Sequence, residues 1–378
     1  MADTQYPRGT VILVGLAAAV VVAIGISELR GILAPVLLTL VLTICAGPVR
    51  TGLEKHGVPR GIATGSVILV VFGLLAVFTY TIIIAFAQFV AMLPDYADQF
   101  QEIAASITTA LALIGIDQTQ VESLAGGLNP ASIAAAVTGA LGSLASITGG
   151  LVIVLTMMIL MAADAVYVRT ILRQLEVTRP HLVAALGAYA SNVRRYMVVT
   201  TVLGVVQGAL NAIALVILEV PAALLWGLLA FLCSFIPNIG YFFAIAPPIV
   251  FGYLTGGWPV VVAVVVVYTI INAVVQSIIQ PRVVGQAVSL SQTLTFFSVL
   301  FWALVIGPIG AILAVPLTLL AKAVLVDSNP DAHAWRPAIG PTAETRSILK
   351  ADYAASKEQR HATKADSRAA AKRARIPQ

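Results

Sequence analysis

Two long apolar runs near the end of this chain are each broken by proline and glycine, and these breaks constrain the fold most. The first run, residues 222–254, contains the break FIPNIG at residues 235–240, and the second, residues 289–321, contains GPIG at residues 307–310. Proline cannot donate a helical hydrogen bond, and glycine frees the backbone at the same place. At membrane depth a broken backbone is tolerated only where protein or water satisfies its polar groups. Each break therefore indicates a binding site or a hinge.

The remaining apolar runs place the whole chain in a membrane. The sequence is 59% hydrophobic and only 10% charged, whereas soluble domains carry roughly 25% charged residues. Runs of about 17 or more apolar residues are typical of membrane-spanning helices. The formal net charge of +5 comes from short loops and the tail, so it indicates contact with the lipid bilayer and not a nucleic-acid partner. We therefore predict an all-α polytopic membrane protein.

Charge along the chain divides it into five segments. Residues 93–148 contain acidic residues but no lysine or arginine, which predicts an extracytoplasmic helical cap, and the basic loops on either side of it predict that both termini are cytoplasmic. The predicted segments are three N-terminal transmembrane helices (1–92), the cap (93–148), a fourth transmembrane helix with a cytoplasmic helical segment (149–196), a transport core with the two breaks (197–322), and a basic, largely disordered cytoplasmic tail (323–378).

The two broken runs admit two topologies. Residues 222–254 would extend about 50 Å as one continuous helix, too long for a single crossing of a bilayer core of about 30 Å. We therefore favour six full spans plus two re-entrant hairpins, although eight spans remain an alternative. In the hairpin topology Arg282 is cytoplasmic, as the positive-inside rule prefers, and an outward helix with its hairpin is followed by an inward helix with its hairpin. Residues 196–321 then form an inverted repeat.

Neutral polar residues are the candidates for a binding site. Gln207 and Asn211 lie one turn apart on the first helix of the repeat, as do Asn272 and Gln276 on the second. Such residues can bind a solute, or they can join helices by hydrogen bonds. Broken helix ends add unpaired backbone groups. The full set of candidate substrate-binding residues is Pro237, Asn238, Gly240, Gln207, Asn211, Asn272, Gln276, Ser291, Gly307, Pro308 and Gly310.

Catalytic chemistry is not expected. The histidines lie in loops or the tail, the two cysteines lie in apolar runs without metal-site spacing, and no acid or lysine lies deep in an apolar run. We expect no enzyme, cofactor or metal.

Three motifs carry a resemblance to a known family. The stretches FIPNIG (235–240), PRVVG (281–285) and FWALVIGPIGAILAVPLT (301–318) resemble the autoinducer-2 exporter family of bacterial membrane transporters. The resemblance implies a homo-oligomeric transporter of the bacterial inner membrane that exports small polar solutes, with a link to quorum sensing. It further implies that Pro281, Arg282, Gly285 and Pro316 are structural motif residues.

One departure from the family bears on the transported solute. Many relatives carry an acidic residue just before PRxxG, whereas this chain has Gln276-Ser277-Ile278-Ile279-Gln280. A cation/proton antiporter needs a titratable group in its pathway. We therefore expect a secondary transporter that exports a small polar solute, such as autoinducer-2 or a related metabolite, by alternating access. The alternatives are a monovalent cation (Na⁺ or Li⁺)/proton antiporter and a non-transporting membrane scaffold.

Overall fold

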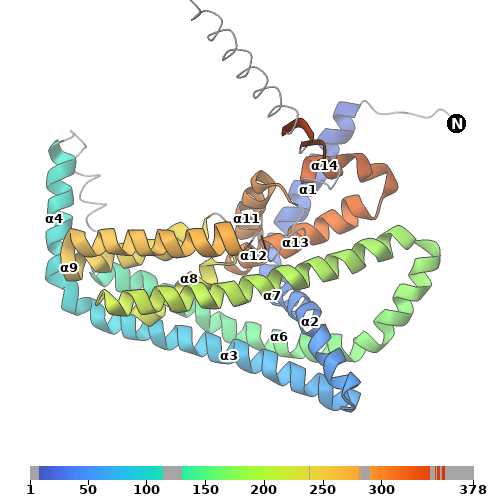
Figure 1. The fold of residues 1–378 in the computed structure, drawn as a ribbon, viewed down its shortest axis with the longest axis horizontal. Helices are drawn as coiled ribbons and strands as arrows, with labels where there is room; N and C mark the ends of the chain where they lie inside the picture. The colour runs from blue at the N-terminus through green and yellow to red at the C-terminus, as the bar shows by residue number, and fades with distance from the viewer. Residues whose placement is uncertain are drawn as a thin grey trace, which may run out of the picture.

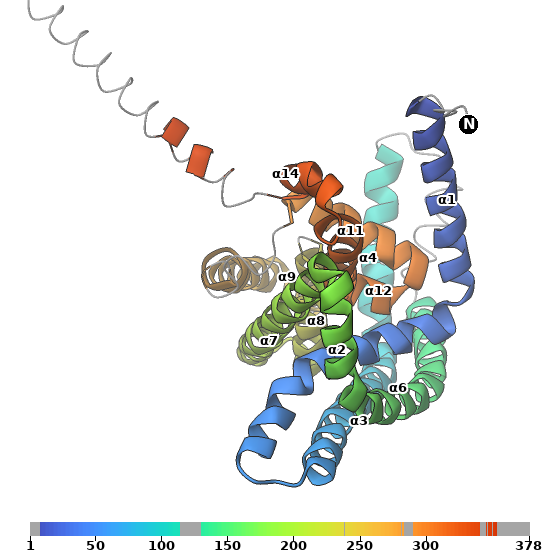
Figure 2. The same ribbon diagram turned by 90° about the vertical axis from the view of Figure 1, so that its right-hand side faces the viewer.

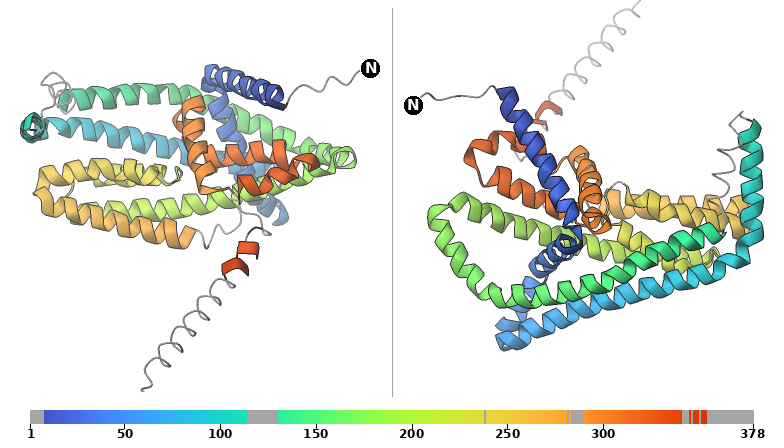
Figure 3. Two further views of the ribbon diagram at one scale, coloured as in Figure 1. Left: turned by 90° about the horizontal axis from the view of Figure 1, so that it is seen from above. Right: turned by 180° about the vertical axis from the view of Figure 1, so that it is seen from behind.

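The protein is a bundle of long helices. The computed structural model describes residues 8–113, 130–237, 239–280, 282, 290–340, 345, 347–349 and 351–353. Every regular element in these residues is a helix, which confirms the all-α prediction. Figures 1, 2 and 3 show most of the long helices lying side by side, with α1 and the C-terminal elements at one end.

The described helices include several that can cross a membrane. Four are long and apolar enough, and a bent pair, Gly149–Ala165 with Thr170–Thr178, raises the number to five. The four helices are Arg30–Lys55, Arg60–Glu102, Pro180–Ile217 and Gly240–Gln276. The chain is therefore a multi-pass membrane protein, as its composition predicts.

The N-terminal part contains three apolar helices. They are α1 (Arg8–Glu28), α2 (Arg30–Lys55) and α3 (Arg60–Met92). Between α2 and α3 the chain turns at Gly57, whose φ of 84° lies in the left-handed region that favours glycine. Pro59 then precedes the first residue of α3, a position where its missing N–H costs little.

The predicted cap begins with a short 3₁₀ turn, η1 (Leu93–Tyr96), and α4 (Ala97–Leu113). Leu93 and Phe100 are buried in a hydrophobic cluster with residues of the first broken segment, so this beginning of the cap is packed on the bundle. Residues 114–129 lie outside the described residues, and the placement of the cap outside the cell stays a prediction.

Two very long helices connect this part to the broken segments. They are α6 (Pro130–Thr178), bent by 66° beyond Ala165, and α7 (Pro180–Ile217). Pro180 occupies the first turn of α7, which is where a helix tolerates proline. Helix α6 packs against α2 and α3, while α7 packs against α2 and against the broken segments.

The first broken segment folds back on itself. Helix α8 (Ala223–Cys233) is followed by a turn and then by α9 (Gly240–Asn272). The rings of Trp226 on α8 and Phe251 on α9 stack with centroids 5.6 Å apart, so the two helices run antiparallel. Helix α9 is itself folded at Gly257, with φ 63° and ψ −155°, and it continues into a π-helix, η2 (Ala273–Ile279).

The second broken segment also folds back. It comprises α11 (Gln292–Ile306), α12 (Pro308–Ile312) and α13 (Ala314–Lys322). The indole Nε1 of Trp302 on α11 donates to Thr318 Oγ1 on α13 at 3.0 Å, so α13 returns alongside α11. Both broken runs are therefore helical hairpins and not continuous single rods. The inverted symmetry between them stays a prediction.

The chain beyond α13 continues as short helical turns. They are η3 (Ala323–Asp327), η4 (Pro330–Trp335) and α14 (Arg336–Ile339). Asp327 forms ion pairs with Lys322 at 2.6 Å and with Arg336 at 3.0 Å. The Ser291 N–H donates to the Ile339 carbonyl at 2.9 Å, so this segment is held against the start of α11.

Candidate functional site

The turn of the first hairpin is formed by its proline and glycine. The Ile236 N–H donates to the Cys233 carbonyl at 3.0 Å, and the Gly240 N–H donates to the Ile236 carbonyl at 3.0 Å. A Cβ on Gly240 would overlap the Cys233 carbonyl oxygen. Glycine is therefore required for α9 to begin this close to the end of α8.

The turn of the second hairpin uses the same residue types. Gly307 has φ 87° and ψ −157°, and Pro308 occupies the first turn of α12. A Cβ on Gly310 would overlap the Trp302 carbonyl oxygen. In both hairpins a glycine of the break thus lies against a carbonyl of the first arm.

The tips of the two hairpins contact each other. Ile236 and Ile239, at the tip of the first hairpin, pack against a buried cluster from the second hairpin, formed by Val299, Ala311 and Ala314. The two breaks, which lie about 70 residues apart in the sequence, are thus brought together. A solute between the tips would meet apolar side chains and the ends of helices. The terminal N–H and C=O groups of a helix have no hydrogen-bond partner within that helix.

A polar seam lies between α7 and the second arm of α9. We use this name for Gln207, Asn211, Tyr268 and Asn272. Gln207 Nε2 donates to Asn272 Oδ1 at 3.4 Å, a long and weak hydrogen bond. Figure 1 shows the two helices running in opposite directions. Asn211, four residues after Gln207, is therefore expected at the level of Tyr268, four residues before Asn272. The seam thus joins the two helices that lead to the hairpins.

Most polar atoms of the seam have no hydrogen-bond partner among the described residues. Asn211 is 1% exposed and Gln207 3%. Within the described residues, both amide atoms of Asn211, Gln207 Oε1 and the Tyr268 hydroxyl form no hydrogen bond. A buried polar group without a partner costs about 1–3 kcal/mol, and helices in lipid have no bulk water to compensate. The seam is therefore able to hydrogen-bond water or a polar solute that enters it.

The same face of α7 continues toward the second hairpin. Tyr196 and Thr200 are buried and have no hydrogen-bond partner on another helix in the part of the chain that the structure describes. Tyr196 belongs to a hydrophobic cluster that includes Val305 and Leu313 of the second hairpin and Phe235 of the first. One helix face thus contacts both hairpins.

Glycines hold the first hairpin against α7. A Cβ on Gly208 would lie 2.6 Å from the Gly227 carbonyl oxygen on α8, and a Cβ on Gly227 would lie 2.7 Å from Ala212 Cβ. A Cβ on Gly204 would overlap Ser234 Oγ. Gly204 and Gly208 form the GxxxG spacing by which membrane helices approach closely, and Gln207 of the polar seam lies between them in the sequence.

The structure places the remaining candidates in different surroundings. Ser291 caps α11, because its Oγ accepts from the Leu294 N–H at 3.2 Å, which gives it a structural role. Gln276 is half-buried in η2. Pro237 and Gly307 are half-buried, Pro308 and Arg282 are exposed, and Gly240, Gly310 and Pro316 are buried. Asn238, Pro281 and Gly285 lie outside the described residues.

Sequence reasoning missed the contribution of Tyr268 to the seam, and it missed the glycine contact between α7 and α8. A sequence signal existed for both, because Tyr268 precedes Asn272 by four residues and Gly204 precedes Gly208 by four. These spacings predict shared helix faces but not the partner helix.

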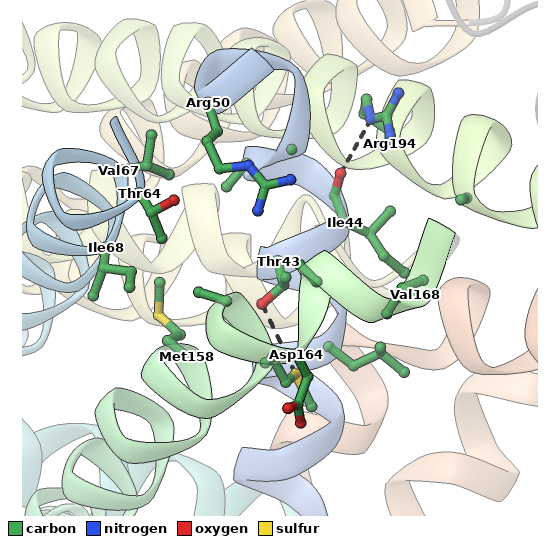
Figure 4. A pocket seen from close by; sticks show the side chains of 17 residues that line it. Thr43, Ile44, Arg50, Thr64, Val67, Ile68, Met158, Asp164, Val168 and Arg194 are labelled. Atoms are coloured by element: carbon green, nitrogen blue, oxygen red, sulfur yellow. Dashed lines mark hydrogen bonds between the residues drawn. The ribbon is translucent and has the colours of Figure 1, made fainter. Parts of the chain in front are cut away.

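A cavity of about 430 Å³ lies elsewhere, among α2, α3, α6 and α7. Figure 4 shows it, with Arg50, Arg194 and Asp164 among mainly apolar side chains. It is separate from the polar seam, because no candidate site residue from the sequence lines it. Sequence reasoning did not anticipate this cavity.

Broken helical hairpins that meet beside a buried polar seam are features of a membrane transporter, and this is the class that the fold and the site define. Residues 11–328 match the model of the AI-2E family transporter, so the chain belongs to that family. This confirms the resemblance seen in the three motifs.

Individual relatives agree with this assignment. The chain is 27% identical to the AI-2 transport protein TqsA of Escherichia coli K12 over 318 residues, covering 84% of this chain and 92% of the relative. It is 27% identical to the putative transport protein YhhT of the same strain over 327 residues, covering 85% and 92%. It is also 27% identical to a putative transport protein of Haemophilus influenzae over 334 residues, covering 87% and 95%. The chain is a multi-pass transporter of the inner membrane.

Proposed function

We propose that the protein exports a small polar solute by alternating access, and that the solute passes between the two hairpin tips and contacts the polar seam. The observation that carries this proposal is the seam itself. Most of its buried amide and hydroxyl atoms have no hydrogen-bond partner among the described residues, and they lie on the two helices that lead into the hairpins. Buried polar groups inside membrane proteins commonly mark substrate paths.

The chemistry of the seam favours a neutral or anionic organic solute. Amide and hydroxyl groups donate and accept hydrogen bonds, as the hydroxyls of a sugar-like molecule require. A monovalent cation/proton antiporter is less well supported, because the described seam contains no carboxylate. TqsA is named as a transport protein for AI-2, so autoinducer-2 is the first solute to test. We also propose that the protein assembles as a homo-oligomer, which light scattering of the purified protein would test.

The experiment measures export of autoinducer-2, and of a panel of neutral and anionic metabolites, from proteoliposomes. The seam variants are Gln207→Ala and Asn272→Ala. The matched controls are Val205→Ala and Ile270→Ala, on the same two helices at positions that are 55% and 57% exposed. We expect at least a tenfold loss of flux in the seam variants and little change in the controls.

Three outcomes would contradict the proposal. Flux that is unchanged in both seam variants would remove the seam from the transport path. A pH change inside the vesicles on addition of sodium, without solute export, would indicate the antiporter. No flux of any solute from the wild-type protein, in vesicles where its correct fold is verified, would favour the scaffold.

A further inference from the structure

The cavity among α2, α3, α6 and α7 combines an apolar lining with two arginines. Apolar and small side chains form most of its wall, among them Ile44, Val67, Met158 and Ala162. Arg50 enters it from α2 and Arg194 lines it from α7. Figure 4 shows the Arg50 guanidinium turned inward among the lining residues. Such a combination suits a ligand with an anionic end and an apolar body.

The two arginines are only partly used by the protein. Arg194 donates from Nε to the Ile44 carbonyl at 3.1 Å, which fixes the side chain, and its terminal nitrogens form no hydrogen bond to another described residue. The Arg50 side chain is 15% exposed, and its Nε lies 3.5 Å from Glu54 Oε1. That Nε is buried without a hydrogen bond to any described residue. The ion pair with Glu54 uses the Nε side of the guanidinium, so the terminal nitrogens of Arg50, which Figure 4 shows among the lining residues, can bind a further anion.

The charge of the lining indicates what kind of anion fits. Arg50 and Arg194 supply two positive charges, and Asp164 supplies one negative charge. Glu54 is not part of the lining, and it is shared between Arg50 and Arg60. A lining with one excess positive charge matches a monoanionic phosphodiester. It matches a doubly charged free phosphate less well, because Asp164 repels the second charge.

The position of the cavity also favours a membrane lipid. Val168 lines the cavity and is 46% exposed, so the cavity reaches the outer surface of the helix bundle. Arg50 lies in the last two turns of α2, close to the basic turn that contains Lys55 and Arg60. Basic residues gather at the level of lipid headgroups, and basic pockets between membrane helices bind anionic headgroups.

We propose that this cavity binds an anionic phospholipid, with its phosphodiester between Arg50 and Arg194 and part of an acyl chain along the apolar wall. The lipid contacts four helices. One of them is α7, which carries Gln207 and Asn211 of the polar seam, so the bound lipid stabilises the position of that helix. This site is separate from the transport path, and its test does not require flux.

The test compares lipid binding by the full-length purified protein and its variants. Native mass spectrometry and thermal denaturation are measured after delipidation and addition of phosphatidylglycerol, phosphatidylethanolamine, glycerol phosphate or inorganic phosphate. The double variant Arg50→Gln with Arg194→Gln removes the proposed anion contacts. Arg173→Gln is the control, since Arg173 is exposed on α6 and does not line the cavity.

We expect phosphatidylglycerol to bind and stabilise the wild-type and Arg173→Gln proteins equally. Affinity should fall at least about tenfold in the double variant, because both charge-assisted hydrogen bonds to the phosphodiester are lost. Phosphatidylethanolamine should bind more weakly, and the two water-soluble phosphates should not stabilise the protein.

Equal phosphatidylglycerol binding by the double variant would overturn the proposal. Equal binding of phosphatidylethanolamine would overturn the preference for an anionic lipid, and stabilisation by glycerol phosphate alone would indicate a site for a soluble anion. If the double variant does not fold, Ala162→Phe provides the second test. It fills the apolar wall without changing charge, and it should displace the lipid; retained lipid in this variant would refute the acyl-chain contact.

Discussion

The contact between α7 and α8 gives the sharpest test of how the first hairpin is held. In Gly208→Ala the new Cβ would lie 2.6 Å from the Gly227 carbonyl oxygen. Carbon–oxygen contacts in helix interfaces are normally about 3.3–3.6 Å, so α8 must move away by about 0.7–1.0 Å. Overpacking of this kind costs about 1–3 kcal/mol, and it displaces the hairpin whose tip meets the second hairpin.

The control is Gly187→Ala in the same helix, where an added Cβ meets no atom within 4 Å. Both substitutions gain the same helix propensity, about 1 kcal/mol, so the difference between the two variants isolates the cost of the contact. Thermal denaturation in detergent should rank Gly187→Ala above the wild-type protein and Gly208→Ala at or below it. Only Gly208→Ala should also reduce flux in proteoliposomes. If the two variants are equally stable and equally active, the close approach of α7 and α8 is not a constraint on the protein.

Four further substitutions provide three tests of other features of the fold. Asn211→Leu removes two buried amide atoms that have no hydrogen-bond partner in the described part of the chain, so it should raise the free energy of unfolding by about 1–3 kcal/mol and lower flux. Lower stability with normal flux would mark Asn211 as a structural contact. Trp302→Phe and Thr318→Val each remove the hydrogen bond across the second hairpin, and a double-mutant cycle in thermal denaturation should give a coupling of about 1 kcal/mol, whereas additive effects would disprove the bond. Asp327→Asn weakens the ion pair with Lys322, so it should lower the free energy of unfolding by about 1 kcal/mol at low salt and by less at high salt. A loss of stability that does not depend on salt would exclude an electrostatic origin.

The hairpins were predictable because their signals are local. Proline and glycine alter the backbone where they stand, so FIPNIG and GPIG locate the two turns without knowledge of the partner helices. Gly257 is a similar case, because its left-handed conformation falls in the short gap that the sequence leaves between residues 254 and 259. Hydrophobic length, together with the position of Arg282, favoured hairpins over single crossings.

The partners of these elements were not predictable, because each depends on which helices meet. The i,i+4 spacing of Gln207 and Asn211 predicts a shared face, but the antiparallel register that brings Asn272 to Gln207 exists only in the fold. The cavity is even harder to predict from the sequence, because Arg50 and Arg194 lie about 140 residues apart. Single arginines near the ends of apolar runs are expected at the membrane surface, and nothing in the sequence pairs these two.

The two kinds of hairpin contact have different consequences for motion. The first hairpin is attached to α7 by backbone-to-backbone approach at glycines, where even one added methyl group has no room. The tips of the two hairpins instead meet through the side chains of Ile236 and Ile239 against alanines of the second hairpin. Apolar side-chain contacts can slide or separate without breaking hydrogen bonds, whereas an interlocked glycine contact allows little relative movement. The alternating access that we propose therefore needs a dividing surface between the tips. In this proposal α7 and the first hairpin move as one body, and the side of the polar seam on α7 moves with it.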